Sequence, residues 1–354
     1  MQRHIDNPCD RHQTGDLLVT VVEPFGLSVR DQALEADVRT GLSAVEAGLL
    51  DATKSEVPFI TEAAQHLVRA GGKRFRPLLV MLAAQFGDPY APGIVPSAVV
   101  VELTHLATLY HDDVMDEADV RRGVDSANTR WGNSVAVLTG DFLFARASHI
   151  LADLGPEAVR IQAEAFERLV TGQILETAGP RDGRDPVDHY LDVMAGKTGS
   201  LVAVSVRFGA MMSGADERVV DTLTQYGERL GVAFQLADDV LDIASDSHES
   251  GKTPGTDLRE GVPTLPVLRL RAMADAEGRP EDLELVALLE SDLTDDDRHA
   301  EALRRLREHP ALEQARKDTV RYAQEARAML APLPDCSAKA ALEELCDAVV
   351  HRAG

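Results

Sequence analysis

The sequence predicts an all-α protein. Apolar residues recur at helical spacing from about residue 31 onward, short breaks rich in Gly and Pro separate these stretches, and no convincing run alternates apolar with polar residues as a half-buried strand does. The composition agrees with this class, because only 4% of the residues are aromatic and the core must be built mainly from Leu, Val, Ala and Ile.

The breaks set the order of the expected helices. Residues 1–30 lack sustained periodicity, so they are interpreted as a variable N-terminal tail. Residues 31–354 are expected to form the folded part, and this length leaves one large domain or two open. The breaks between helical stretches fall at Gly71-Gly72, Gly87 to Pro89, Gly155-Pro156, Gly179 to Pro186, Gly214, Gly251 to Pro263 and Gly278 to Pro280.

Two helix starts can be placed from acidic residues. Asp185 precedes Pro186, a pairing typical of an N-cap followed by the first helical position. The acidic run 292–298 is predicted to be a solvated loop and helix cap. Its Asp295-Asp296 pair is followed by His299 instead of a third Asp, so acidic clustering alone does not create the motif described below.

The overall charge excludes several partners. The chain carries 59 acidic and 36 basic residues, a formal net charge of -23, which repels nucleic acid and anionic lipid. Apolar stretches such as 94–101 fall short of the ~20 residues of a membrane span, and residues 1–16 lack a signal-peptide core. We expect no nucleic-acid partner, no membrane span and a cytoplasmic location. Three cysteines without Cys-x-x-Cys spacing support neither a disulfide framework nor a zinc site.

Two Asp-Asp-x-x-Asp motifs carry the strongest chemical signal. The first and last aspartates of each lie one above the other on a helix face, with the second about 100° round. Carboxylates in an apolar cleft need cations to remain ionised, and hard oxygen ligands favour Mg²⁺ bridged to phosphates. One motif could be an exposed acidic face in so acidic a chain, but two copies flanked by apolar helix favour a Mg²⁺-diphosphate site. The motifs comprise Asp112, Asp113, Asp116, Asp238, Asp239 and Asp242.

Basic residues occur at several separate positions before and after these motifs. The segment 71–77 (GGKRFRP) combines a flexible turn with cations that open a helix, where backbone N–H groups also favour an anion. Arg121 and Arg122 follow the first motif, and Lys197 and Lys252 stand among acidic neighbours. Each alone is typical of a surface cation. Their order along the chain is the informative feature.

That order identifies a resemblance. GGKRFRP, HDDVMDEADVRRG, GKTGSL, FQLADDVLD and GKTPGTDLREGVPTLP follow one another between residues 71 and 266. The chain resembles the trans-isoprenyl (polyprenyl) diphosphate synthases. This resemblance implies an isoprenoid synthase-type helical bundle around a deep central cavity, a catalytic domain at residues 31–354 and a homodimer. It also implies a reaction of ionisation, condensation and elimination.

The resemblance also implies roles for individual residues. The six aspartates would bind Mg²⁺, with three ions per active site, on two sides of the allylic diphosphate, and Lys197 would join them in catalysis. The allylic diphosphate would be held by Arg121, Lys197, Thr198, Gln235 and Lys252. Isopentenyl diphosphate would be held by Lys73, Arg76, His105 and Arg122. Many members carry Lys where this chain has Thr256 and Val262, so the hold on diphosphate there is expected to be weaker.

The residues before Asp112 bear on product length. Thr108, Thr104 and Val101 lie four, eight and eleven positions upstream, with Ala107 beside them, and no aromatic residue blocks this face. Each helical turn rises about 5.4 Å, close to one extended isoprene unit. ATLYHDD resembles the long-chain enzymes, which implies a long all-trans product for quinone side chains. Phe142, Phe144 and Phe166 could form the cavity floor but fit ordinary core equally well.

The sequence leaves other functions open. A geranylgeranyl diphosphate synthase is the nearest alternative. The His111-Asp112 pair is also found at the centre of helical metal-dependent phosphohydrolases, although that class leaves 238–242 and GGKRFRP unexplained. Terpene cyclases share the helical fold but only one aspartate motif. A non-catalytic partner subunit of a heteromeric synthase would commonly have lost metal ligands that this chain keeps.

Overall fold

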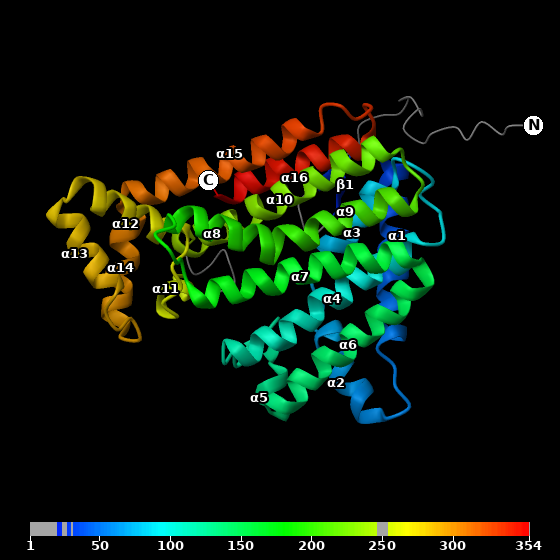
Figure 1. Ribbon diagram of the computed structural model, residues 1–354, viewed down its shortest axis with the longest axis horizontal. Coiled ribbons are helices and arrows are strands. Elements are labelled where there is room, and N and C mark those ends of the chain that lie inside the picture. The colour runs from blue at the N-terminus through cyan, green and yellow to red at the C-terminus, as the bar shows by residue number, and fades with distance from the viewer. Residues whose placement is uncertain (1–19, 23–26, 30, 246–253, 354) are drawn as a thin grey trace, which may run out of the picture. The chain divides into compact units, whose positions relative to one another are not determined.

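The computed structural model describes residues 20–22, 27–29, 31–245 and 254–353, and these are mostly helical (Figure 1), which confirms the all-α prediction. The helices are α1 Gln32–Ala52, α2 Pro58–Arg69, α3 Phe75–Ala84, α4 Ile94–Met115, α5 Ala127–Trp131, α6 Asn133–Leu154, α7 Pro156–Ala178, α8 Pro186–Met194, the π-helix η2 Ala195–Gly199, α9 Ser200–Met212, α10 Glu217–Ala244, α11 Thr256–Arg259, α12 Leu265–Glu277, α13 Pro280–Leu289, α14 Asp296–Glu308, α15 Pro310–Met329 and α16 Ser337–Ala353.

Two short antiparallel hairpins interrupt the helices. β1 (Thr20–Val22) pairs with β2 (Leu27–Val29), and β3 (Val120–Arg121) pairs with β4 (Val124–Asp125). Strands of two or three residues are too short to show an alternating pattern, which is why the sequence did not predict them. Of the predicted tail at residues 1–30, only β1 and β2 lie within the described residues.

The chain divides into two compact units. The first comprises Met1–Glu167, Leu201–Gly227 and Met329–Glu344. The second comprises Arg168–Ser200, Glu228–Ala328 and Leu345–Gly354. The first aspartate motif lies in unit 1 and the second in unit 2. Each site is therefore described within its own unit.

Helix α4 is the central element of unit 1. It packs against α6 most extensively and also against α1 and α3. Its Leu103 and Leu106 are fully buried, as the aliphatic composition predicts. Tyr110 is fully buried as well, and its hydroxyl donates to the Ala63 carbonyl at 2.6 Å, which fastens α2 to α4. The C-terminal end of α4 is thus held firmly where the first motif begins.

The predicted caps are confirmed in unit 2. The Asp185 carboxylate accepts hydrogen bonds from the first backbone N–H groups of α8 at 2.9 and 3.0 Å, with Pro186 at the first helical position. The Asp295 carboxylate accepts from the Arg298 N–H at 2.9 Å and caps α14. The acidic run at 292–298 therefore starts a helix, as predicted.

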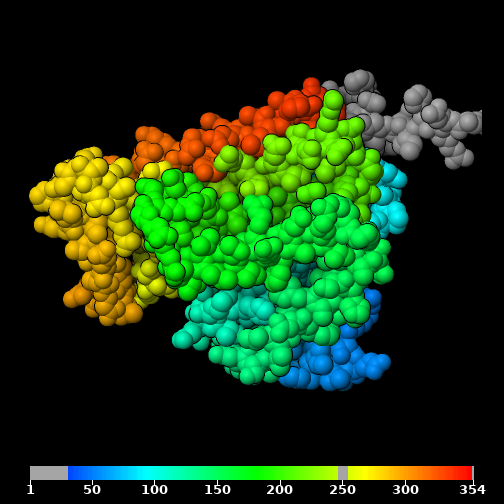
Figure 2. Space-filling model, viewed as in Figure 1, coloured from blue at the N-terminus to red at the C-terminus, as the bar shows by residue number. Residues whose placement is uncertain are grey.

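Helix α6 has an exposed apolar surface. Among the described helices it is the one long and apolar enough, by length and composition, to cross a membrane, although only a third of its apolar stretch is buried. This is weak evidence for a span, because a helix that covers another protein surface has the same features. The sequence analysis did not single this helix out. Figure 2 shows α6 at the surface, in teal-green at the lower centre.

Candidate active site

The first motif closes the C-terminal end of α4. Asp112 and Asp113 lie in its last turn, and Asp116 is the C-cap, with its N–H bonded to the Asp112 carbonyl at 2.7 Å. Asp113 is fully buried, and its Oδ1 accepts from Arg121 Nε at 2.5 Å. Burial raises the pKa of Asp113, and Arg121 opposes that shift. Its Oδ2 is buried without a hydrogen-bond partner among the described residues.

A tight turn brings Arg121 back to this carboxylate. Arg121 pairs with Val124 across the β3–β4 hairpin, and the two residues between them, Arg122 and Gly123, have φ values of 54° and 76°. Positive φ at both central positions is typical of the type I′ turn that joins tightly paired strands. The turn therefore gives two consecutive arginines different partners, since Arg121 pairs with Asp113 and Arg122 bonds to the Gly71 carbonyl in the loop before α3.

Asp239 is the buried member of the second motif. Its Oδ2 accepts from the Tyr190 hydroxyl and from the Leu265 N–H at 3.3 Å, and its Oδ1 accepts from Gln235 Nε2 at 3.3 Å. Burial raises the pKa of Asp239 to about 7, despite these hydrogen bonds. The pKa of Tyr190 is raised well above its ordinary value by burial and by the neighbouring carboxylate, so it remains a hydrogen-bond donor. Tyr190 therefore orients Asp239.

The other two aspartates of the second motif are also held in place. Asp238 Oδ1 accepts from the guanidinium of Arg352 at 2.6 Å. The Asp242 carboxylate accepts from the backbone N–H groups of Thr256 and Asp257 at 3.2 and 3.3 Å. Thr256, where many family members carry Lys, thus contributes its backbone to the motif. The side chain of Val262, the other departure, is exposed.

Three of the predicted allylic-diphosphate residues lie together in unit 2. Lys197 and Thr198 sit on the π-helix η2, a distortion that is frequent at functional sites. Lys197 Nζ pairs with Glu176 Oε2 at 2.7 Å, and Thr198 Oγ1 donates to Gln235 Oε1 at 3.4 Å. Because Gln235 also donates to Asp239, this group is connected to the second motif. Lys252 lies outside the described residues.

The predicted isopentenyl-diphosphate residues form a cationic cluster in unit 1. Arg76 lies in the first turn of α3, His105 lies on α4, and Lys73 is exposed in the loop before α3. Burial lowers the pKa of Arg76 to about 10, and burial beside Arg76 and Arg122 lowers the pKa of His105 well below 6.5. His105 is therefore neutral at physiological pH. Arg76 Nε is buried with no hydrogen-bond partner among the described residues, a state that an anionic ligand would relieve.

A divalent metal fits these residues, although they form no closed cage. Within the described ranges, no three acidic, His or Cys side chains converge in a way that could hold a metal ion. Mg²⁺ does not need such a cage, because it is commonly held by one or two carboxylates together with waters and substrate phosphates. The buried, unpaired Oδ2 of Asp113 is the kind of hard ligand this arrangement requires.

The predicted chain-length residues differ in exposure. Val101 and Ala107 are fully buried and Thr104 is 1% exposed, whereas Thr108 is half-buried. Thr104 Oγ1 accepts from Gln162 Nε2 on α7 at 2.9 Å. In this conformation, Thr108 is thus the member of the set with appreciable accessible surface. The path that these residues were predicted to line remains a prediction.

Two of the predicted floor candidates contact each other in unit 1. The rings of Phe144 and Phe166 lie 4.5 Å apart, and the His111 ring lies 5.8 Å from Phe144. Phe142 is half-buried on α6. Since all three aromatic side chains are half-buried, the structure leaves both interpretations, cavity floor and ordinary core, available for them.

Three residues of these sites were missed by the sequence analysis. Tyr190 and Arg352 reach their aspartates from 49 and 114 positions away, and no local pattern marks either one. Arg74 lies within GGKRFRP but was given no role. Only its position between two predicted ligands, Lys73 and Arg76, could have drawn attention to it.

An all-α fold with two aspartate motifs and separate cationic groups defines a prenyltransferase that handles diphosphates. Residues 57–306 match the family described as polyprenyl synthetase. The chain belongs to the polyprenyl synthetase family.

Individual relatives agree with this assignment. The chain is 47% identical over 330 residues to a nonaprenyl diphosphate synthase of Mycobacterium tuberculosis, a match that covers 93% of this chain and 97% of that protein. Two solved structures are similar in fold. One is a geranylgeranyl pyrophosphate synthase from Corynebacterium glutamicum complexed with calcium and isoprenyl diphosphate (TM-score 0.81, 45% identity, 92% and 98% covered), and the other is a decaprenyl diphosphate synthase from Rhodobacter capsulatus (TM-score 0.82, 36% identity, 91% and 99% covered).

Proposed function

We propose that the protein condenses isopentenyl diphosphate with farnesyl, geranyl or geranylgeranyl diphosphate to make a long-chain all-trans polyprenyl diphosphate for quinone side chains. The observation that carries this proposal is a pair of buried atoms without hydrogen-bond partners, on side chains of opposite charge, among the described residues of unit 1. An anion would pair with Arg76 Nε, and a cation would pair with Asp113 Oδ2. A phosphate-binding cluster and a metal-binding carboxylate on one helical unit suit a reaction that uses two diphosphates and a metal.

The chain's own residues bind and orient the substrates. Arg76 and Arg122 would hold the diphosphate of isopentenyl diphosphate, with neutral His105 offering a hydrogen bond without adding charge. In unit 2, Lys197 and Thr198 would contact the allylic diphosphate. Preorganised cations of this kind stabilise the charge that develops on a departing diphosphate, which is commonly the largest catalytic term.

Magnesium is the proposed metal, with three ions per active site and both aspartate motifs as ligands. When bound, it supplies Lewis-acid stabilisation of the leaving group. The calcium in the Corynebacterium structure supports a divalent cation. The Tyr190 and Gln235 hydrogen bonds to Asp239 would keep that carboxylate oriented for such an ion.

The product length is proposed to depend on Thr108. Thr108→Phe should shorten the product by one or more isoprene units, because a ring would occupy the accessible surface one turn before Asp112. Chromatography of radiolabelled products measures this effect. Thr108→Val, which matches the volume of Thr, is the control and should leave the length unchanged. An unaltered product from Thr108→Phe would reject the assignment.

A homodimer is proposed on the basis of the exposed face of α6. Leu138 is 65% exposed, and it stands in a stripe of exposed, mostly small residues that would let a second copy approach closely. This stripe comprises Ser134, Leu138, Asp141, Ala145, Ser148 and Ala152. The same contact would cover the apolar surface of α6 without a membrane. We further propose a cytoplasmic location, where water-soluble diphosphate substrates are available.

Leu138→Lys should weaken this dimer by about tenfold or more, because a charged head would be buried at the contact. Sedimentation velocity over a dilution series measures the dissociation constant. Leu283→Lys, which replaces a 50%-exposed leucine on α13, is the matched control and should not change it. An identical dissociation constant for the Leu138 variant would argue against α6 as the interface.

The reaction type is tested by following diphosphate release from an allylic primer with and without isopentenyl diphosphate. The proposal predicts release that depends on isopentenyl diphosphate and is accompanied by elongation. Release without it would favour a phosphohydrolase. A product no longer than geranylgeranyl diphosphate would favour the shorter-chain synthase, the function of the Corynebacterium neighbour.

A further inference from the structure

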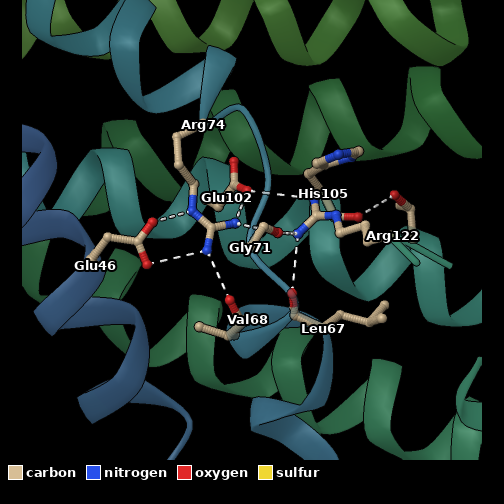
Figure 3. A network of polar contacts seen from close by, with 9 residues as sticks. Glu46, Leu67, Val68, Gly71, Arg74, Glu102, His105 and Arg122 are labelled. Atoms are coloured by element: carbon tan, nitrogen blue, oxygen red, sulfur yellow. Dashed lines mark hydrogen bonds and ion pairs between the residues drawn. The ribbon is translucent and has the colours of Figure 1, made fainter. Parts of the chain in front are cut away.

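Arg74 directly follows Lys73 at the start of α3, and it is buried although it is charged (Figure 3). Its guanidinium donates to both carboxylate oxygens of Glu46 on α1 and to Glu102 on α4 at 3.0 Å. It also donates to the Val68 carbonyl at 3.0 Å and to the Gly71 carbonyl at 3.4 Å. Arg74 therefore joins α1, α2 and α4 to the loop before α3.

Arg122 fastens the same loop from the other side. Its guanidinium donates to the Leu67 carbonyl at 3.1 Å and to the Gly71 carbonyl, the atom that Arg74 also contacts. A Cβ at Gly72 would lie 2.8 Å from the Arg122 guanidinium carbon, and Gly72 has a φ of 149°, so another residue there would be strained and would displace the Arg122 guanidinium. The Gly71 carbonyl is thus held by two cations, the buried Arg74 and the half-buried Arg122.

Both arginines have a left-handed backbone, with φ of 50° at Arg74 and 54° at Arg122. This conformation is unfavourable for side chains other than Gly, Asn or Asp, and it persists only where surrounding contacts enforce it. The hydrogen bonds of the two guanidinium groups supply those contacts. Strain maintained in this way is common where a ligand-binding geometry must be kept.

The carboxylates are distributed unevenly among the arginines. Glu102 is 2% exposed and lies 3.0 Å from Arg74 and 3.9 Å from Arg122, while Glu46 forms its ion pair within the described part of the chain with Arg74. Arg76 forms no ion pair among the described residues, and its Nε has no partner. Arg74 is thus compensated by direct ion pairs, whereas Arg76, two residues later, feels the charge of Glu102 without a direct ion pair and keeps an unpaired Nε that suits an anionic ligand.

We propose that Arg74, held by Glu46 and Glu102, is a positioning residue that fixes Lys73 and Arg76 for the diphosphate of isopentenyl diphosphate. This inference rests on the proposed function. It makes α1, which carries none of the predicted ligands, part of the binding site through Glu46. Glu102 has a second task, because its charge allows two arginines to approach the same carbonyl.

Glu46→Gln tests this role with little risk to folding, since the Glu46 side chain is 44% exposed and the change is nearly isosteric. The variant should raise the KM for isopentenyl diphosphate about tenfold, which corresponds to about 1.4 kcal/mol. The KM for the allylic primer and kcat should change less than twofold. Glu35→Gln, which makes the same change on α1 at a glutamate that pairs with Arg39, is the control and should change none of these.

Arg74→Lys provides an independent variant, because it keeps the charge but cannot bridge two carboxylates and two carbonyls at once. Arg74→Lys should raise the KM for isopentenyl diphosphate. In the double variant with Glu46→Gln, the free-energy effects of the two substitutions on this KM should be less than additive. Calorimetric titration of isopentenyl diphosphate into each protein should show the same order of affinities. An unchanged KM for isopentenyl diphosphate in an active Glu46→Gln enzyme would overturn the positioning role of Arg74, and so would equal increases in the KM values of both substrates. Neither result would affect the proposed function. Absence of both elongation and isopentenyl diphosphate binding in the wild type would overturn the proposed function as well.

Discussion

Asp113→Asn is expected to reduce kcat for prenyl transfer on the order of 10³-fold, equivalent to about 4 kcal/mol of transition-state stabilisation. The amide is nearly isosteric with the carboxylate but carries no charge to hold a divalent cation. It also leaves Arg121, which bonds to Asp113 Oδ1 at 2.5 Å, without its anionic partner. Initial rates at saturating substrates across a Mg²⁺ series measure the loss.

Asp119→Asn is the matched control for this experiment. Asp119 is exposed, lies three residues beyond the motif and undergoes the same chemical change. Its rate should stay within about twofold of the wild type, as is usual for a surface substitution. If Asp113→Asn kept more than about a third of wild-type activity, the buried carboxylate could not have the role assigned to it in electrostatic catalysis.

Arg76→Gln is expected to raise the KM for isopentenyl diphosphate on the order of 10²-fold, because two charge-assisted hydrogen bonds to phosphate are each worth about 1.5 kcal/mol. The KM for the allylic primer should hardly change. The free energy of unfolding should change little, since the substitution removes a guanidinium whose buried Nε has no hydrogen-bond partner among the described residues and which Glu102 stabilises without a direct ion pair.

Steady-state kinetics with each substrate varied in turn and urea unfolding measure these two expectations. Arg69→Gln, an exposed arginine on α2 that bonds to Gln65, is the control and should leave both KM values unchanged. A rise in only the KM for the allylic primer would indicate that Arg76 binds that primer and would contradict its assignment to isopentenyl diphosphate.

Local patterns in the sequence were sufficient for the fold class and the helix starts. Asp185 caps its helix as predicted, and the cap predicted within the run 292–298 is Asp295, because a cap depends on the next three residues only. The family resemblance rests on contiguous motifs, and the family match confirms it.

Contacts between distant segments could not be predicted from one sequence. Glu46 and Glu102 each lie 28 positions from Arg74, on opposite sides in the chain, and both are ordinary acidic residues of helices. The Tyr190 hydroxyl reaches Asp239 only because tertiary packing brings α8 beside α10. The residues that orient the predicted ligands were therefore harder to find than the ligands themselves.

The central claim is tested most directly by incubating the purified protein with Mg²⁺, radiolabelled isopentenyl diphosphate and farnesyl diphosphate, and sizing the extracted products. Geranyl and geranylgeranyl diphosphate serve as parallel primers. The account predicts metal-dependent incorporation of label into products longer than geranylgeranyl diphosphate with at least one primer. No elongation with any of the three would contradict it.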